Sequence, residues 1–265
     1  MTRRERQRQI LATLETLSEL SLVDACERFG ASSATIRRDF VQLAENGQVA
    51  RTWGGIQLAG RGALQMGPPA FNERLGSNTA EKRLVARAAA QILNDGDVVM
   101  IDGGTTTFQL AEFIAHKRIR VITNSLMMAH AIDRLKAGKL GAEVYLTGGL
   151  LEPQSGVVVG PLAEESLRRY RAKWVFLSAA GIDAETVTNY NEAVLGSERL
   201  MISQSEQVVL LADSSKLGRQ SMCELCRVGD VDRFFTVANT RHEPTVTAIA
   251  DQGVEVVRVD DGERH

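Results

Sequence analysis

The stretch that decides the first part of the fold is Ser33-Ala34-Thr35-Ile36-Arg37-Arg38-Asp39-Phe40. Ser32 or Ser33 can accept backbone N–H bonds and so cap a helix that begins here. Ile36, Phe40 and Leu43 recur at positions i, i+4 and i+7, which predicts one buried stripe along that helix.

The opposite face of this helix presents Arg37 and Arg38 beside the smaller side chains of Ala34 and Val41. Guanidinium groups form paired hydrogen bonds with base edges and with phosphates, so such a face suits the major groove of DNA. Taken alone, the octet leaves a second interpretation open, in which the two arginines are a solvated pair on an ordinary amphipathic helix.

The flanking residues favour the interpretation as a DNA-reading helix. Helices are expected over residues 4–17 and between Ser21 and Gly30, where glycine suits the left-handed end of a helix. The octet's own helix runs to about residue 46, and residues 49–58 predict a small hairpin. This order is the layout of a winged helix-turn-helix domain, which places one helix in the major groove. The DNA-binding residues predicted from this layout are Ser33, Thr35, Arg37, Arg38, Arg51, Gly54 and Gly55.

The charge of the chain limits how it can bind DNA. Its 265 residues carry a formal net charge of −2, and the length leaves room for two domains. Residues 1–57 carry eight arginines and seven acidic residues, a net charge of +1. Affinity for DNA must therefore come from a few placed arginines, and it should fall with salt because phosphate contacts release counterions.

Several function classes are not expected from this sequence. No apolar run is long enough to span a membrane, and no apolar core follows the charged first residues as in a secretion signal. Three cysteines argue against a disulfide framework and for a reducing cytoplasm. Cys223 and Cys226 lack a second pair and the histidines show no ligand spacing, so no metal or other cofactor is expected. No Gly-x-Ser-x-Gly motif of a hydrolase is present.

A second domain is expected after a linker. Residues 59–79 contain several glycines and prolines and show little periodicity, which is typical of a linker. Short Val/Ile/Leu runs then alternate with helical patterns, which predicts a mostly parallel α/β sheet. Its expected strands are Val98–Ile101, Arg120–Thr123, Glu143–Leu146, Trp174–Ser178, Val208–Ala212 and Phe234–Val237. The expected organisation is a winged helix-turn-helix domain over residues 1–58, a linker over 59–79 and an α/β domain over 80–260.

The loop after the first of these strands predicts an anion site. It reads Asp102-Gly103-Gly104-Thr105-Thr106-Thr107 and opens a helix. The glycines permit close backbone approach, while threonine hydroxyls and free N–H groups of the helix start can converge on a phosphate. The alternative is a tight glycine turn with a threonine cap and no ligand.

Other strand ends offer polar or glycine residues to the same edge of the sheet, where ligands bind in open α/β folds. Lys216 is the best candidate for a cation facing a phosphate or a sugar oxygen, although a lone lysine in a polar loop is more often simply solvated. Besides residues 102–107, the predicted pocket includes Asn124, Gly148, Gly181 and Lys216.

These motifs together resemble the DeoR family of transcriptional regulators, in the layout of its glycerol-3-phosphate and amino-sugar repressors. The resemblance runs from Arg6 to about Val237, and its most specific part is Thr35-Ile36-Arg37-Arg38-Asp39 followed by Gly54-Gly55. The second domain matches in order at Glu81-Lys82, Asp102-Gly103-Gly104-Thr105-Thr106, Thr123-Asn124-Ser125, Gly148-Gly149, Gly160 and Ala212-Asp213-Ser214-Ser215-Lys216.

The resemblance implies a sensor domain with the fold shared by ribose-phosphate isomerase, glucosamine-phosphate deaminase and coenzyme A transferases. It implies operator DNA and a phosphorylated sugar or related effector as partners, a dimer or tetramer of identical chains, and repression that ends when the effector binds. The sequence departs from the family at Ala193, Val194 and Glu198, where the family carries an acidic run and a lysine.

Two functions fit these observations. The first is a repressor that responds to a ligand. The second is a sugar-phosphate isomerase or deaminase with a DNA-binding appendage, in which Asp102 and Lys216 would be catalytic. Proton transfer needs a positioned base, and the segment Ala179-Ala180-Gly181 lacks the carboxylates that the related isomerases carry there. Sensing without turnover is therefore the favoured prediction.

Overall fold

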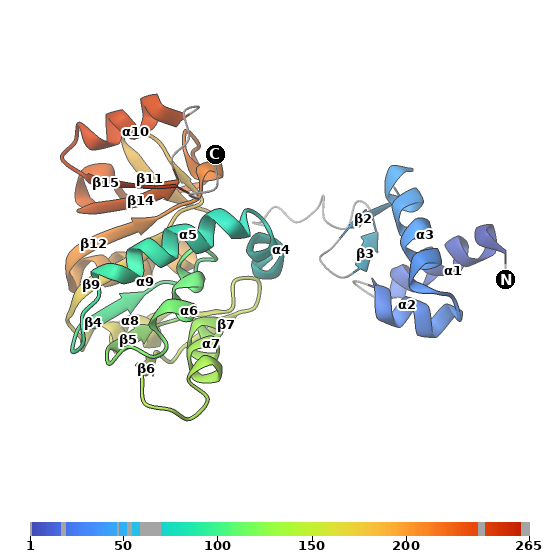
Figure 1. Ribbon diagram of the computed structural model, residues 1–265, viewed down its shortest axis with the longest axis horizontal. Helices are drawn as coiled ribbons and strands as arrows, with labels where there is room; N and C mark the ends of the chain where they lie inside the picture. Colours follow the sequence, from blue (N-terminus) through green and yellow to red (C-terminus); the bar gives the residue numbers. More distant parts are fainter. Residues whose placement is uncertain are drawn as a thin grey trace. The chain divides into compact units, whose positions relative to one another are not determined.

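The computed structural model describes residues 2–16, 20–46, 48–51, 55–58, 70–237 and 242–260. The chain divides into two units, Met1–Pro68 and Pro69–His265, and each contains a hydrophobic core (Figure 1). The division falls inside the predicted linker. Residues 59–69 of that linker lie outside the described residues, whereas residues 71–76 form a helix, so the linker boundaries stay a prediction.

The first unit is a three-helix domain with a small antiparallel sheet. Its elements are α1 (Arg3–Thr16), β1 (Leu20–Ser21), α2 (Leu22–Phe29), α3 (Ser33–Glu45), β2 (Val49–Arg51) and β3 (Gly55–Leu58). β3 lies between β1 and β2 in the sheet. This confirms the winged helix-turn-helix layout, to which the structure adds β1, a strand too short to show any alternation in sequence.

Local sequence explains where these helices begin and pack. Ser21 caps α2, and Ser32, rather than Ser33, caps α3 by accepting the backbone N–H of Thr35 at 3.4 Å. Gly30 ends α2 with a φ of 59°, in the left-handed region that glycine adopts freely. The predicted stripe of α3 is buried against α1, α2 and the sheet: Ile36, Phe40 and Leu43 are 0%, 6% and 1% exposed.

The second unit alternates helices and strands. Its helices are α4 (Phe71–Gly76), α5 (Thr79–Ala89), α6 (Leu110–Ile114), α7 (Leu126–Lys136), α8 (Pro161–Arg168), α9 (Glu192–Ser203) and α10 (Glu243–Ala250), with short turns η1 (Ala90–Ile92), η2 (Thr107–Gln109), η3 (Ser214–Lys216) and η4 (Val228–Asp230). Its strands are β4 (Val98–Ile101), β5 (Arg120–Thr123), β6 (Glu143–Leu146), β7 (Leu150–Glu152), β8 (Val157–Val159), β9 (Ala172–Ser178), β10 (Gly181–Ile182), β11 (Thr186–Asn189), β12 (Ser205–Leu211), β13 (Cys223–Arg227), β14 (Arg233–Val237) and β15 (Glu255–Val259).

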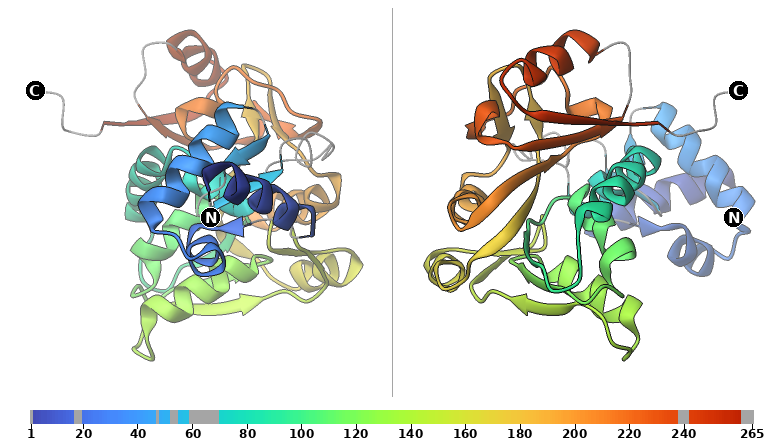
Figure 2. Two further views of the ribbon diagram at one scale, coloured as in Figure 1. Left: turned by 90° about the vertical axis from the view of Figure 1, so that its right-hand side faces the viewer. Right: turned by 60° about the vertical axis from the view of Figure 1, so that its left-hand side comes forward.

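The main sheet has the order β15-β14-β12-β9-β4-β5-β6, and every neighbouring pair is parallel. Its central strands are buried on both faces: Val99 and Ile101 of β4 join one core, and Met100 joins the other. α5, α6 and α7 cover the first face, while α8, α9 and α10 cover the second (Figure 2). All six predicted strands belong to this sheet, which confirms the predicted α/β class.

The direction of chain progression reverses between β4 and β9. From β4 the chain proceeds outward to β5 and β6, and it then returns to β9 on the other side and continues to β12, β14 and β15. Open α/β sheets bind ligands outside the carboxyl ends of the strands at such a point. β4 leads directly into Asp102, so the predicted anion loop lies at this position.

Candidate functional site

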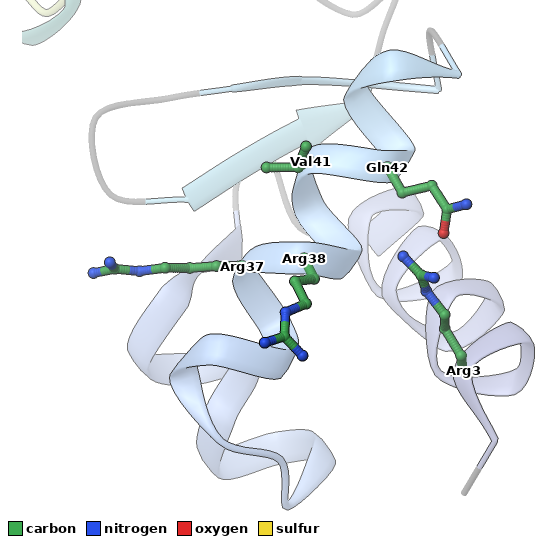
Figure 3. A pocket seen from close by; sticks show the side chains of 5 residues that line it. All are labelled: Arg3, Arg37, Arg38, Val41 and Gln42. Atoms are coloured by element: carbon green, nitrogen blue, oxygen red, sulfur yellow. The ribbon is translucent and has the colours of Figure 1, made fainter.

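The exposed face of α3 carries the predicted arginines. Arg37 and Arg38 are exposed, as is Ser33. The two arginines line an open hollow of about 350 Å³ on the surface of the first unit (Figure 3). The residues lining this α1–α3 hollow are Arg3 of α1 and Arg37, Arg38, Val41 and Gln42 of α3.

Thr35 lies at the start of α3 and is half-buried. Its hydroxyl lies 2.9 Å from the hydroxyl of Ser32, and its backbone N–H is the one that Ser32 caps. Thr35 therefore stabilises the beginning of the helix, and its contact with DNA stays a prediction.

Asp39 is a buried carboxylate of α3 that belongs to the motif quoted above but to which the sequence assigned no role. It is 1% exposed and accepts hydrogen bonds from Nε of Arg6 at 2.5 Å, Nε of Arg3 at 3.3 Å and Nε2 of Gln7 at 3.4 Å. A buried charge is stable only when it is paired, and these three donors all come from α1. Asp39 therefore fixes α1 against α3. The arginines clustered around residue 5 were the sequence signal that could have indicated a buried carboxylate partner.

The hairpin residues have a clear structural role. Arg51 ends β2, where it pairs with Ile56 of β3. At Gly55, a Cβ atom would lie 2.0 Å from the carbonyl oxygen of Leu20, so only glycine lets β3 approach β1. Gly54 lies outside the described residues. Contacts of these residues with DNA stay predictions.

Asp102, at the end of β4, organises the predicted anion loop. It is 1% exposed, and one oxygen accepts the N–H of Gly104 at 3.1 Å and the hydroxyl of Thr107. The other oxygen accepts the N–H and the hydroxyl of Ser178 at 2.7 and 2.8 Å. Both oxygens are thus used to hold the loop and to tie it to β9. The hydroxyl of Thr107 points to Asp102 and Gly104 rather than to a common point with its neighbours.

The two glycines of the loop are required by packing. A Cβ at Gly103 would lie 2.0 Å from a methyl group of Val157, and one at Gly104 would lie 1.6 Å from the hydroxyl of Ser178. The sequence predicted that these glycines let a ligand approach the backbone. In the structure, the lack of a Cβ atom lets the loop pack closely against Val157 of β8 and Ser178 of β9. Thr105 and Thr106 follow in the same buried loop, at 5% and 3% exposure.

Three buried oxygens without hydrogen-bond partners lie at the carboxyl ends of strands of the main sheet. Asn124 follows β5, Thr147 follows β6 and Asp213 follows β12, and all three are nearly fully buried. Within the described residues, Asn124 Oδ1, Thr147 Oγ1 and Asp213 Oδ2 have no hydrogen-bond partner. Unsatisfied buried oxygens cost free energy unless something donates to them, which indicates a polar ligand or ordered water at this edge.

One buried and two half-buried cationic side chains lie at the same edge. Burial lowers the pKa of Lys82, in α5, to about 8, against the opposing charge of Asp213. Burial also lowers the pKa of Lys216, which again faces Asp213 and lies within the electrostatic reach of Arg74. Lys82 donates to the carbonyl oxygen of Arg74. The structure therefore brings together Lys216, which was predicted, and Lys82 and Arg74, which were not.

Glu198 is a second buried carboxylate in the reach of Asp102. Burial raises its pKa to about 8, and the charge of Asp102 adds to the rise. Nδ2 of Asn189 donates to both of its oxygens at 3.0 and 3.1 Å. This is the position at which the family resemblance led us to expect a lysine.

The remaining predicted pocket residues are glycines with different surroundings. Gly148 is exposed and lies against Leu162, which a Cβ atom would meet at 3.3 Å. Gly181 begins β10, and its Cβ would lie 2.4 Å from the carbonyl oxygen of Arg219. The structure gives Gly181 a packing role, and contact of either glycine with an effector stays a prediction.

Among the described residues, no group of three or more His, Cys, Asp or Glu side chains could hold a metal ion, and Cys26, Cys223 and Cys226 are free thiols. In that part of the chain, no helix is both long and apolar enough to cross a membrane.

Two family models match this chain. The DeoR-like helix-turn-helix domain matches residues 6–61, and the DeoR C terminal sensor domain matches residues 77–237. The first match runs from within α1 to just past β3, and the second runs from the residues before α5 to the end of β14.

Relatives are similar along most of their length. The uncharacterized HTH-type transcriptional regulator YulB of Bacillus subtilis is 31% identical over 256 residues, 96% of each chain. The HTH-type transcriptional regulator GlpR of Haloferax volcanii is 32% identical over 260 residues, also 96% of each chain. The HTH-type transcriptional repressor GlcR of Bacillus subtilis is 31% identical over 236 residues, 89% of each chain. Among solved structures, ribose 5-phosphate isomerase A of Methanocaldococcus jannaschii is 17% identical with a TM-score of 0.39, covering 53% of this chain and 55% of that chain.

Proposed function

The chain belongs to the DeoR family of transcriptional regulators, and we propose that it represses a sugar or polyol catabolic operon until a phosphorylated sugar-type effector releases it from DNA. One observation carries the effector half of this proposal. The buried Lys82, the half-buried Lys216 and unpaired buried acceptors lie at the carboxyl edge of the sheet. Cations pair with a phosphate, and unpaired oxygens accept hydrogen bonds from sugar hydroxyls.

In this proposal the effector pocket has two parts. The loop Gly103–Thr106 and Lys216 hold the phosphate, with Asp102 and Thr107 keeping the loop in shape. Asn124 accepts from a hydroxyl of the effector, and Gly148 and Gly181 border the space it occupies. We add Lys82 and Arg74 to the proposed effector pocket. The charge of Lys82 interacts with Asp213, and the charge of Arg74 interacts with Asp102.

The DNA-binding half follows from the exposed face of α3. Arg37 and Arg38 contact base edges or phosphates of the major groove, and Ser33 and Thr35 contact the backbone at the helix start. Arg51 and the Gly54-Gly55 turn reach the neighbouring backbone. We propose that identical chains assemble with two-fold symmetry, which would place two α3 helices on half-sites separated by whole turns of DNA.

Release from DNA requires that the effector distinguish two states of the regulator. A ligand shifts an equilibrium only as far as its affinities for the two states differ. The effector must therefore bind the arrangement that is unable to hold the operator more tightly than the arrangement that holds it.

The hydrogen bonds of Asp102 disfavour the alternative function, an isomerase or deaminase in which Asp102 is catalytic. A general base must reach the substrate with a free oxygen, but both oxygens of Asp102 accept bonds from Gly104, Thr107 and Ser178 in a buried loop. Membership of a family of regulators agrees with a sensing role for this domain.

The Arg37→Ala variant tests the assignment of α3. Duplexes enriched by the full-length chain from a random DNA pool provide the operator probe for mobility-shift titrations. We expect the variant to bind this probe at least about tenfold more weakly, because a paired guanidinium contact is lost. Arg87→Ala, which removes an exposed arginine of α5, is the matched control. Unchanged affinity in the Arg37 variant would remove the DNA-reading role of α3.

A further inference from the structure

The α1–α3 hollow contains an apolar side chain on an otherwise cationic surface. Val41 is 39% exposed, although its neighbour Phe40 is buried in the core at 6% exposure. Val41 lies one helical turn from Arg37 and Arg38, at spacings of four and three residues. The exposed face of α3 that carries Arg37 and Arg38 therefore also presents the aliphatic side chain of Val41.

The wall of the hollow opposite Arg37 comes from α1. Arg3 extends from α1 toward Gln42, while Arg37 points away on the far side of Val41 (Figure 3). Nε of Arg3 donates to Asp39 at 3.3 Å, and Oε1 of Gln42 accepts from Nε2 of Gln7 at 2.9 Å. These bonds hold Arg3 and Gln42 in place, so the surroundings of Val41 are defined before any DNA arrives.

Cations on both sides of Val41 suit a site that lies between phosphates. Inside the major groove, the apolar group that a base pair presents is the 5-methyl group of thymine. A partly exposed valine next to arginines on a recognition helix is complementary to that methyl group. An apolar contact there adds sequence information that a phosphate contact does not supply.

We infer that Val41 is a specificity-determining residue and that the α1–α3 hollow receives the 5-methyl group of a thymine in operator DNA. The inference rests on the proposed docking of α3 in the major groove. It adds a base preference at one position and gives Arg3 and Gln42 the role of framing that position.

Deoxyuridine substitution tests the inference without changing the fold of the protein. The duplex enriched by the full-length chain is synthesised with each thymine replaced in turn by deoxyuridine, which removes the methyl group alone. We expect one such replacement per bound α3 to weaken binding of the unaltered chain about fourfold, the effect of one lost methyl contact. With Val41→Ala, the same replacement should change affinity less than twofold. Val23→Ala, which trims an exposed valine of α2, should keep the full fourfold effect.

Each outcome is decisive. Unchanged affinity for every deoxyuridine duplex would overturn the inference, as would equal sensitivity in Val41→Ala and the unaltered chain, or an enriched sequence with no recurrent thymine. Failure of the chain to enrich any sequence would contradict the DNA-binding proposal itself, which separates the two hypotheses.

Discussion

Asp39 joins α1 to α3 through a buried charge. Its carboxylate receives Arg3, Arg6 and Gln7 while 1% exposed. Removing one partner of a buried charge pair costs about 3–5 kcal/mol because the other partner stays uncompensated. We therefore expect Asp39→Asn to destabilise the first unit by about that amount.

Hydrogen exchange resolved by peptide measures this effect in the full-length chain. Amides of α1 and α3 should exchange faster in Asp39→Asn, while those of β4 and β9 keep their rates. Glu27→Gln, which neutralises an exposed carboxylate of α2, is the control. Equal exchange of α1 in the variant and the unaltered chain would contradict the role of Asp39.

Glu198 makes stability depend on pH in a direction that can be stated beforehand. Its folded pKa is raised from 4.5 to about 8, so between these values the folded state binds more protons than the unfolded state. Stability from this group is fully present below pH 4.5 and is lost as the pH rises through 8. Glu198→Gln mimics the protonated acid and should gain stability over the unaltered chain as pH rises, by on the order of 5 kcal/mol.

Thermal unfolding between pH 5 and 9 checks this prediction. The difference in melting temperature between Glu198→Gln and the unaltered chain should widen up to about pH 8, the raised pKa, and then stay constant. Glu185→Gln removes an exposed carboxylate and should show no such widening. A constant difference for Glu198→Gln would show that the carboxyl group is not held protonated.

Residues of the site differ in how far sequence could predict them. The stripe of Ile36, Phe40 and Leu43 follows from spacing alone, because helical periodicity is local. Asp39, Lys82 and Glu198 could not be found in this way. Whether a charged side chain is buried depends on partners contributed by other elements, and no local pattern records those partners.

The wing of the first unit depends on one close approach between strands. Because a Cβ atom at Gly55 would lie 2.0 Å from the carbonyl oxygen of Leu20, Gly55→Ala forces β1 and β3 apart. We expect a loss of about 1–3 kcal/mol, the usual cost of overpacking. Affinity for the enriched duplex should also fall, although every arginine is retained.

Urea unfolding and mobility-shift titration measure the two effects. Gly229→Ala is the control, since its Cβ would meet only an ordinary contact at 3.7 Å. If Gly55→Ala kept both its stability and its DNA affinity, the pairing of β1 with β3 would not matter to the wing.

Elements of the second unit were predictable in proportion to their length and burial. The central strands of the main sheet are short apolar runs buried on both faces, so they are visible in sequence. β10 and the hairpin β7–β8 have two or three residues per strand, too few for alternation to appear. α4 was missed because the glycines and prolines before residue 70 extended the linker prediction over it.

At the scale of the whole molecule, the sequence could predict which loops lie together, because the topology of a parallel sheet fixes where its strands end. Parallel strands end at the same edge, so the loop at Asp102 and the loop at Lys216 were expected to face one site, and electrostatic coupling through Arg74 agrees with that. Which of the loop residues support the fold and which meet a ligand was not predictable. Asp102 and Thr107 satisfy one another, and only the three-dimensional arrangement shows it.

Binding of DNA and effector must be linked reciprocally if the chain is a sensor. A thermal-shift panel identifies a sugar phosphate that binds, because the bound compound raises the melting temperature. If that compound weakens DNA binding by some factor, then DNA must weaken binding of the compound by the same factor. Lys216→Ala should keep its affinity for the enriched duplex but lose about 10- to 100-fold in affinity for that compound, because a charge-assisted hydrogen bond is lost. Titrations of each ligand with and without the other measure all four affinities.

Lys139→Ala is the matched control for this cycle, since Lys139 is an exposed lysine of the loop after α7. It should respond to the compound as the unaltered chain does. Arg37→Ala should give the converse result, with full affinity for the compound and little for DNA. If Lys216→Ala were released from DNA at the same concentrations as the unaltered chain, the effector would bind away from the carboxyl edge of the sheet. The unpaired oxygens of Asn124, Thr147 and Asp213 would then be explained by ordered water alone.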